Sequence, residues 1–178
     1  GRHYRGDSID QNFDTYSTEF TYADGTKLFL EGRCIAGAAA DHSSTAHGTK
    51  GLAIISEKGH IPSRARIYRG QNASPADLVW AYPQPEKNPY QLEWDELVRA
   101  IRDDRPYNEV KRGVEASLVT SMGRMSAHTG QTVTYEQMLN CDHEFAPGVD
   151  RFTAESPAPL QPDANGKYPV PRPGQIGR

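Results

Sequence analysis

The residues best suited to chemistry lie in two short clusters. Asp41, His42 and His47 fall within one loop and strand, and two imidazoles with a carboxylate suit zinc or iron. Their spacing matches no specific metal motif, so we favour surface or substrate contacts over metal binding. The run from Cys141 to Glu144 is a weaker candidate, because one cysteine with adjacent residues cannot close a tetrahedral site alone. We therefore assign no metal ligand.

Nucleotide-binding motifs are absent from the sequence. No G-x-G-x-x-G follows an expected strand and no G-x-x-x-x-G-K-S/T occurs, so the chain has no sequence-visible nucleotide site. No Ser-His-Asp or paired-carboxylate arrangement can be picked out, because such groups meet in space rather than in sequence. Arg33 is interpreted first as a charge on a sheet surface, and His128 as a half-buried packing residue at the edge of a helical apolar stripe.

Composition limits the class of protein. The 178 residues are 36% hydrophobic and 24% charged, which fits one domain with a single core. A net charge of -3 gives no reason to expect nucleic acid or an anionic membrane as partner. Two distant cysteines form no disulfide framework, so we expect a cytoplasmic protein, with export of the parent protein as the alternative. The start lacks an initiator Met and a signal peptide, which indicates a processed chain or an engineered fragment.

The stretch from Asn108 to Gly130 predicts one long helix at the centre of a layered domain. Asn108 is placed at its N-cap and Gly130 at its C-terminal, left-handed position. One face carries an apolar stripe, and an adjacent row carries only small side chains, which lets another element approach the backbone closely. The stripe is Val110, Val114, Leu118, Met122 and Met125, and the small row is Gly113, Ala116, Thr120, Gly123 and Ala127.

Strands precede the helices along the chain. Residues 12–23 and 26–35 predict a hairpin around Asp24-Gly25, and Leu52–Ser56 and Ala65–Arg69 predict further strands. Helices are expected from Leu92 to Asp104 and from Thr134 to Asn140, the latter with a capping box. The fold class is therefore α+β: an open, largely antiparallel sheet with helices packed on one face and the other face used for oligomerisation. The apolar residues offered to that interface are Tyr16, Phe20, Tyr22, Leu28 and Leu30.

The end of the chain differs from the rest. We divide the chain into an α+β domain over residues 1–147 and a Pro-rich irregular tail over residues 148–178. Six prolines between Pro157 and Pro173 make a packed ending improbable, so the tail is expected to lie along a neighbour or to be loose.

The segment from Tyr90 to Leu139 resembles the closing part of the Gfo/Idh/MocA oxidoreductases, the glucose-fructose oxidoreductase and inositol dehydrogenase family. The matching pieces are E-x-x-x-L-V-x-A-I-R, R-P-Y-N-E, S-M-G-R-M-S-A-H-T-G and T-V-T-Y-E-Q-M-L. Upstream, FDTYSTEFTYADGTKLFLEGRCIAG followed by HGTKG is similar to that family's C-terminal sheet, in the bacterial subgroup with a Pro-rich end. The resemblance covers residues 1–147.

This resemblance implies a two-domain enzyme. An N-terminal Rossmann domain, which this chain lacks, would bind NAD or NADP, while the present domain forms the substrate side and packs its sheet against an identical subunit. The family's Gly-rich loop, catalytic lysine and Asp-His pair have no matching position here, so we assign no catalytic or cofactor-binding residue. The chain alone is expected to be inactive, because hydride transfer needs both domains.

The expected substrate is a sugar, polyol or related hydroxyl compound. Arg33, His42 and His47 are our candidates for substrate contacts, because they lie at strand ends or in the loop around the small-residue segment GAAADHSSTA. Two alternatives stay open: a domain of an NAD-dependent glycosidase or lyase of the same family, and a non-catalytic carbohydrate-binding or structural module. Cofactor consumption separates the first alternative from a net dehydrogenase. An upstream reading frame encoding G-x-G-x-x-G would remove the second.

Overall fold

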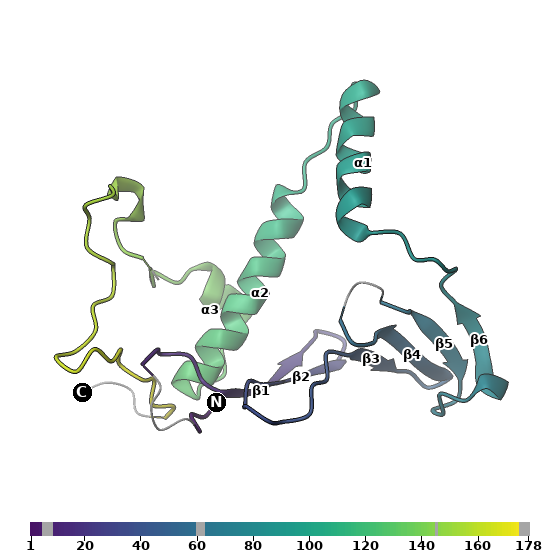
Figure 1. The fold of residues 1–178 in the computed structure, drawn as a ribbon, viewed down its shortest axis with the longest axis horizontal. Helices are drawn as coiled ribbons and strands as arrows, with labels where there is room; N and C mark the ends of the chain where they lie inside the picture. The colour runs from purple at the N-terminus through teal and green to yellow at the C-terminus, as the bar shows by residue number, and fades with distance from the viewer. Residues whose placement is uncertain (5–8, 60–62, 145, 175–178) are drawn as a thin grey trace. The chain divides into compact units, whose positions relative to one another are not determined.

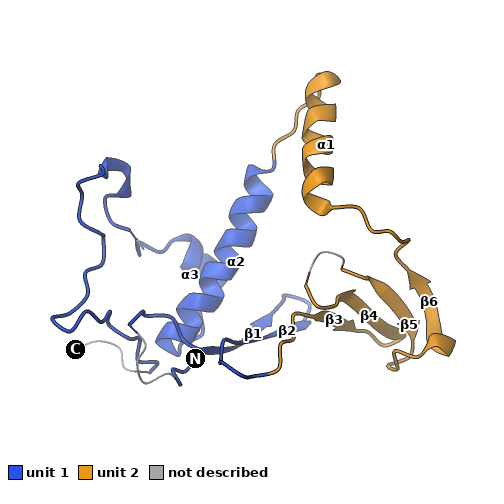
Figure 2. Cartoon of the chain, viewed as in Figure 1, with its two compact units in different colours: residues 1–38, 109–178 blue, residues 39–108 orange. Residues whose placement is uncertain are grey.

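The computed structural model describes residues 1–4, 9–59, 63–144 and 146–174. The chain forms two compact units, coloured separately in Figure 2. Unit 1 consists of residues 1–38 and 109–178, and unit 2 of residues 39–108. The division expected from the sequence, at residue 147, thus does not coincide with the boundaries of these units.

Unit 1 begins with a β-hairpin. β1 (Thr15–Thr21) pairs antiparallel with β2 (Lys27–Arg33) around the predicted Asp24-Gly25 turn. Gly25 has a φ of +86°, a conformation that lacks a steric penalty only for glycine. The Asp24 side chain accepts a 2.9 Å hydrogen bond from the Thr26 amide and closes the turn. The predicted hairpin is confirmed.

α2 (Val110–Thr129) is the long helix of unit 1 and lies against β1 (Figure 1). It ends at Gly130, which has a left-handed φ of 70°, as predicted. Its start differs from the prediction: the N-cap is Glu109, whose side chain caps no amide in the described chain. The Gly113 amide donates to the Glu109 carbonyl at 2.9 Å, so the helical hydrogen bonds begin there and the predicted N-cap at Asn108 is wrong.

The row of small residues on α2 makes a close contact near its C-terminal end. A Cβ added to Gly123 would lie 2.7 Å from Cζ of Phe20 on β1. At Gly113, by contrast, a Cβ would meet no described atom within 4 Å. Val110 and Val114 are 68% and 56% exposed. The predicted central helix is therefore packed in its C-terminal half, while its N-terminal half is exposed.

The hairpin uses one face to pack against α2. By strand register, Tyr16 and Phe20 of β1 share this face with Leu28 and Leu30 of β2. Tyr16 and Phe20 contact α2, whereas Leu28 and Leu30 remain 44% and 50% exposed. Two of the five residues that the sequence offers to an oligomer interface, Tyr16 and Phe20, thus pack within unit 1.

The remaining elements of unit 1 are short. α3 (Tyr135–Leu139) packs against α2, and Met138 is its buried residue. It carries the predicted capping box, in which the Gln137 amide donates to Thr134 Oγ1 at 3.1 Å and the Thr134 amide donates to Gln137 Oε1 at 2.8 Å. A 3-10 turn, η2 (Val149–Arg151), follows.

The Pro-rich tail hydrogen-bonds to the rest of unit 1 at two places. The Tyr168 amide donates to the Ile9 carbonyl at 2.8 Å, and the Gly174 amide donates to the Thr129 carbonyl at 2.8 Å. The described part of the tail therefore lies along its own chain. Residues 175–178, the end of the predicted tail, lie outside the described residues.

Unit 2 contains a four-stranded antiparallel sheet. Its strands, in spatial order, are β3 (Ser44–His47), β4 (Gly51–Ser56), β5 (Arg66–Arg69) and β6 (Leu78–Ala81), with the 3-10 turn η1 (Pro75–Asp77) before β6. The sequence predicts β4 and β5 but misses the other two. β3 has the sequence STAH, which carries little apolar signal, and β6 lies within a Pro-rich segment that indicates a loop.

α1 (Pro89–Arg102) completes unit 2. Asn88 caps the helix by accepting a 3.0 Å hydrogen bond from the Tyr90 amide. Pro89 fits the first turn, where its missing N–H removes no helical hydrogen bond. For this reason α1 begins before the predicted start at Leu92.

The fold class is α+β with open antiparallel sheets, as predicted. The structure has two sheets, of two and four strands, in place of the single predicted sheet. In the part of the chain that is described, no helix is both long and apolar enough to cross a membrane.

The two glycines of α2 provide a matched test of its packing. Gly113→Ala should raise the free energy of unfolding by up to about 1 kcal/mol, because alanine is the better helix former and the added methyl meets open space. Gly123→Ala should instead lower it by about 1 kcal/mol or more, because the methyl would press on the Phe20 ring. Urea denaturation of both variants measures the difference. Equal stabilisation by both would show that Phe20 does not pack on Gly123.

Candidate functional site

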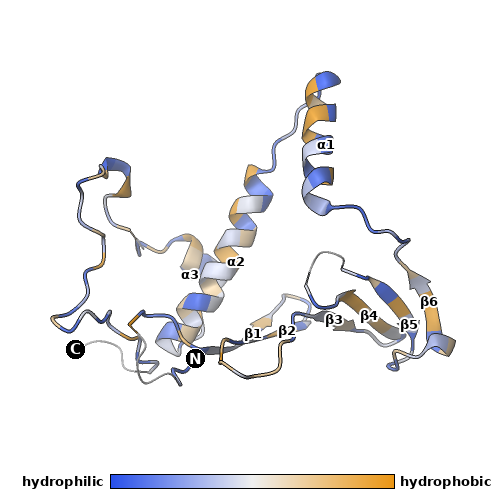
Figure 3. Cartoon of the chain, viewed as in Figure 1, coloured by the Kyte–Doolittle hydropathy of each residue, from blue (hydrophilic) through white to orange (hydrophobic). Residues whose placement is uncertain are grey.

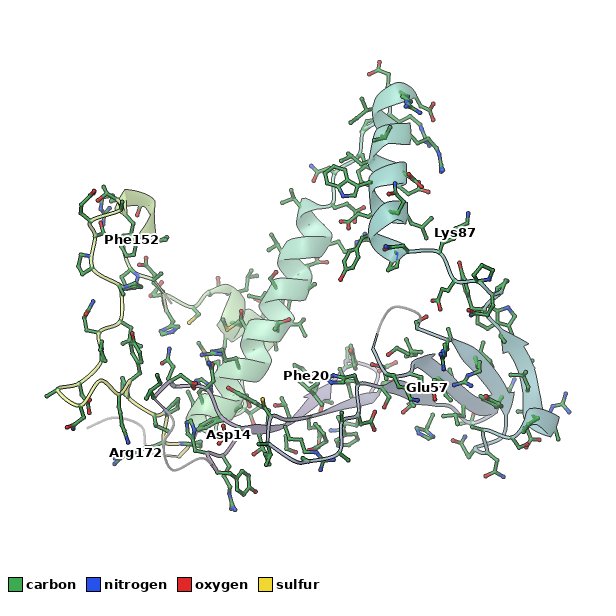
Figure 4. The ribbon with its side chains drawn as sticks, in the orientation of Figure 1. Asp14, Phe20, Glu57, Lys87, Phe152 and Arg172 are labelled. Carbon is green, nitrogen blue, oxygen red and sulfur yellow. The ribbon has the colours of Figure 1, made fainter. Side chains whose placement is uncertain are left out.

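A polar cluster lies where the chain enters β1. Asp14 is 1% exposed and is labelled in Figure 4. Its carboxylate accepts a 2.6 Å hydrogen bond from the Tyr4 amide, and its Oδ2 lies 3.9 Å from His3 Nδ1. Its backbone is bonded on both sides, with its amide donating to Arg2 O at 2.9 Å and its carbonyl accepting from the Cys34 amide at 2.7 Å. Asp14 therefore joins the first residues of the chain to the end of β2.

A second pair of polar groups lies beside Asp14. Tyr16 Oη and His128 Nε2 are 3.0 Å apart, which links β1 to the last turn of α2. Between them and His3 lies the buried ring of Phe13, with ring-centroid distances of 5.4 Å to His3 and 5.0 Å to His128, both edge-on. Such edge-to-face contacts favour one packing of the rings over others.

The charge state of His128 follows from its surroundings. Burial of the imidazole, followed by the positive charge of Arg124, lowers the pKa of His128 from 6.5 to about 4. At neutral pH the ring is therefore uncharged, with one nitrogen that donates and one that accepts, and the tautomer decides which of Tyr16 Oη and His128 Nε2 is the donor. Tyr16 Oη in turn accepts from the Phe13 amide at 3.3 Å.

This cluster holds acid and base groups without an evident place for a substrate. A carboxylate with an imidazole, and a phenol with an imidazole, are pairs that transfer protons in enzymes. Asp14, however, is enclosed by protein, and it lines neither the hollow formed by residues 144, 146 and 148–151 nor the hollow on the sheet of unit 2. We interpret the cluster as the junction that holds the N-terminal segment, β1 and α2 together.

The residues predicted to contact substrate belong to two different units. Arg33 is exposed at the end of β2, opposite Thr15, and belongs to unit 1. His42 and His47 belong to unit 2 and are both exposed. The backbone carbonyl of His42 accepts a 2.7 Å hydrogen bond from the Gly59 amide. Arg33 thus belongs to one unit and the two histidines to the other.

His47 has a local structural contact. Its Nδ1 lies 2.7 Å from Gln71 Oε1, an oxygen that can only accept, so Nδ1 is the donor. Gln71 Nε2 donates to the Gly48 carbonyl at 2.8 Å, which ties the β3–β4 turn to the end of β5. Within the described ranges, no group of three or more His, Cys, Asp or Glu side chains could hold a metal ion. Neither Asp41 with His42 and His47 nor the run from Cys141 to Glu144 therefore forms such a group in the described residues.

The sheet of unit 2 has one face with buried side chains and one face with exposed apolar side chains. Leu52 and Tyr68, paired across β4 and β5, are 7% and 6% exposed. On the other face, Ile55, Ile67 and Trp80 are 54%, 44% and 45% exposed. Figure 3 shows the hydrophobic residues along β4 and β6. Three large apolar side chains on one sheet face form a surface suited to association.

A shallow hollow of about 600 Å³ lies on this sheet. Ala46, Ala53 and Ile67 form part of its wall, and Lys50 and Arg69 also line it. Apolar walls with a few charged groups are the usual make-up of a small-molecule site, although this hollow is open to solvent.

Comparison with models of protein families, with curated proteins and with solved structures found no match.

Sequence reasoning missed Asp14 and the partners of His128. An aspartate between Phe13 and a strand gives no local sign of burial, because its partners Tyr4 and Cys34 are supplied by other segments. The sequence does place His128 correctly as a half-buried packing residue, and the structure adds Tyr16 as its hydrogen-bonding partner.

Protonation of His128 should destabilise the protein in mild acid. The unfolded chain takes up a proton near pH 6.5 and the folded chain only near pH 4, so stability is complete above pH 6.5 and falls as the pH is lowered towards 4. The loss assigned to this residue should be about 1 kcal/mol, since solvent screens the half-exposed ring.

The measurement is thermal unfolding of the protein and of His128→Gln between pH 7 and 4. The variant should lose less stability over this range than the parent. The exposed His42 supplies the control, and His42→Gln should retain the pH dependence of the parent. Parallel curves for the parent and His128→Gln would contradict the assignment.

Proposed function

We propose that this chain is the substrate-side and oligomerisation domain of an NAD(P)-dependent oxidoreductase of the Gfo/Idh/MocA kind, acting on a sugar, polyol or related hydroxyl compound. A Rossmann domain elsewhere in the parent enzyme would bind the nicotinamide cofactor, which supplies the hydride chemistry. The present chain would contact the substrate and hold identical subunits together.

The observation that carries this proposal is the solvent-exposed apolar face of the β3–β6 sheet. Its exposed Ile55, Ile67 and Trp80 contrast with the buried Leu52 and Tyr68 on the other face. An antiparallel sheet commonly buries one face and keeps the other polar, but this second face is apolar. Packing it against the same face of an identical subunit would remove these side chains from water. The sequence resemblance also implies packing of an open sheet against an identical subunit, there through the hairpin residues Tyr16, Phe20, Tyr22, Leu28 and Leu30.

Substrate contacts remain proposed for Arg33, His42 and His47. All three side chains are exposed, and a guanidinium and two imidazoles can hydrogen-bond the hydroxyls of a sugar or polyol. One ring nitrogen of His47, Nδ1, is already hydrogen-bonded to Gln71. His42 and Arg33 are therefore the stronger candidates of the three.

Association and cofactor binding can be measured on this chain directly. Sedimentation equilibrium should show a dimer or larger assembly, and added NADH should show no change in fluorescence, because no cofactor site is assigned to this chain. Ile67→Glu should weaken the association at least about tenfold, since it would bury a charge in the apolar interface.

Ile35→Glu is the matched control. Ile35 is 38% exposed, close to the 44% of Ile67, but lies outside the sheet face. This variant should associate like the parent. A monomeric parent that binds NADH would overturn both the assigned role of the sheet and the absence of a cofactor site.

A further inference from the structure

β2 is an edge strand of unit 1. Among the described residues its sheet contains two strands, β1 and β2, so β2 presents a row of backbone N–H and C=O groups with no strand beside it. Its residues are exposed except Gly32, which is half-buried, and Phe29 is 66% exposed. A sheet of two strands is marginally stable in water, and further strands stabilise it.

Hydrogen bonds at the two ends of the hairpin show which backbone groups of β2 face outward. Next to the turn, the Tyr22 amide donates to the Thr26 carbonyl at 2.9 Å. At the far end, the Cys34 amide donates to the Asp14 carbonyl at 2.7 Å. Bonded and non-bonded pairs alternate along an antiparallel ladder, and the register between these ends has no shift. The even-numbered residues of β2 therefore bond to β1, and the odd-numbered residues face away from it.

The central outward-facing residues of β2 are Lys27, Phe29 and Glu31. In the described chain, no backbone group from outside the hairpin bonds to them. Their side chains share the polar face of the hairpin, on which Phe29 is a large exposed apolar residue. An edge that carries free donors and acceptors, two opposite charges and one aromatic ring restricts which strand can be added to it.

We propose that β2 pairs with β2 of a second copy of this chain, antiparallel and about a two-fold axis at Phe29. In this register Phe29 faces Phe29 of the second copy, and Lys27 faces Glu31 of the second copy. On the other side of the sheet, Leu28 faces Leu30 of the second copy. The outward-facing backbone groups over this stretch all meet a partner, and the two hairpins form one continuous sheet.

The side chains select this register over its neighbours. The register can change only in steps of two residues, because facing residues must both have outward backbone groups. One step sets Lys27 against Arg33 of the second copy, where two cations repel. The opposite step sets Glu31 beside Gly25 of the second copy, so the ion pairs are lost. The proposed register alone among these places an aromatic pair at the centre and opposite charges on both sides of it.

The two charges of β2 have capacity for a further partner. Within the chain, Lys27 pairs with Glu19, and Glu31 accepts a 2.6 Å hydrogen bond from Ser17. An ammonium group has three donors and a carboxylate accepts at both oxygens, so each can also bond a group of the second copy. This surface belongs to unit 1, whereas the apolar face of the β3–β6 sheet belongs to unit 2, so the pairing does not depend on the enzyme class proposed above.

Cysteine cross-linking tests the register. In a background with Cys34→Ser and Cys141→Ser, a mixture of Leu28→Cys and Leu30→Cys chains should form a disulfide-linked dimer under mild oxidation. The reason is that directly facing residues of a non-hydrogen-bonded pair have Cα atoms about 4.5 Å apart, which a disulfide can span. Either variant alone should cross-link far less, because its two cysteines are offset along the strands. Both leucines are about half exposed, at 44% and 50%, so the hairpin can fold without them.

Non-reducing electrophoresis and intact mass measure the cross-link. A mixture that gives no linked dimer would overturn the pairing. Equal cross-linking of either single variant and of the mixture would overturn the register, because random collision or a different alignment would then account for the product.

A charge reversal tests the ion pairs. Glu31→Lys should weaken association about tenfold, because it replaces two attractive contacts by two repulsive ones. Glu115→Lys is the matched control, since it makes the same change of charge on the exposed half of α2 and should associate like the parent.

Sedimentation equilibrium at low salt measures both dissociation constants, in the parent and in the Ile67→Glu background. The second background removes association through the β3–β6 sheet, so each surface can fail without the other. Ile67→Glu chains that are monomeric and give no cross-link would overturn the β2 pairing and leave the sheet interface standing. Equal effects of Glu31→Lys and Glu115→Lys would also overturn it.

Discussion

Unit 1 depends on the close approach between the Phe20 ring and the backbone of α2 at Gly123. A larger side chain there would push on the Phe20 ring, because even a Cβ would lie 2.7 Å from Cζ of Phe20, inside van der Waals contact. The same approach brings Tyr16 within hydrogen-bonding distance of His128 one turn further along. The aromatic cluster around Phe13 and the burial of Asp14 follow from the position of β1 on the helix.

Features encoded by neighbouring residues could be predicted from the sequence. The hairpin follows from Asp24-Gly25, and the start of α3 from the Thr134-Gln137 capping box, because each is closed by hydrogen bonds within a few residues. The left-handed end of α2 at Gly130 is of the same kind. The N-cap of α2 was misplaced by one residue, which is the usual uncertainty where no side chain caps the helix.

Features that depend on distant residues could not be predicted. β3, with the sequence STAH, becomes a strand because β4 offers it hydrogen bonds. β6 has strand-forming residues, LVWA, but the prolines on either side of it indicate a loop, and its pairing with β5 decides the outcome. The Tyr16–His128 bond joins residues that are 112 positions apart. Likewise, the separation of Arg33 from His42 and His47 into different units follows from how the chain folds, whereas in the sequence they surround one loop.

Unit 2 is an insertion between two halves of unit 1, since residues 39–108 separate β2 from α2. A ribosome releases the whole of unit 2 while the hairpin before it still lacks its helix. The apolar face of the hairpin must therefore stay exposed for the time taken to synthesise about seventy residues, at roughly 5–20 residues per second. The opposite face of the hairpin carries the polar residues Ser17, Glu19 and Glu31 beside the exposed Phe29. Translation speed through the inserted unit thus sets how long this nascent chain is open to aggregation.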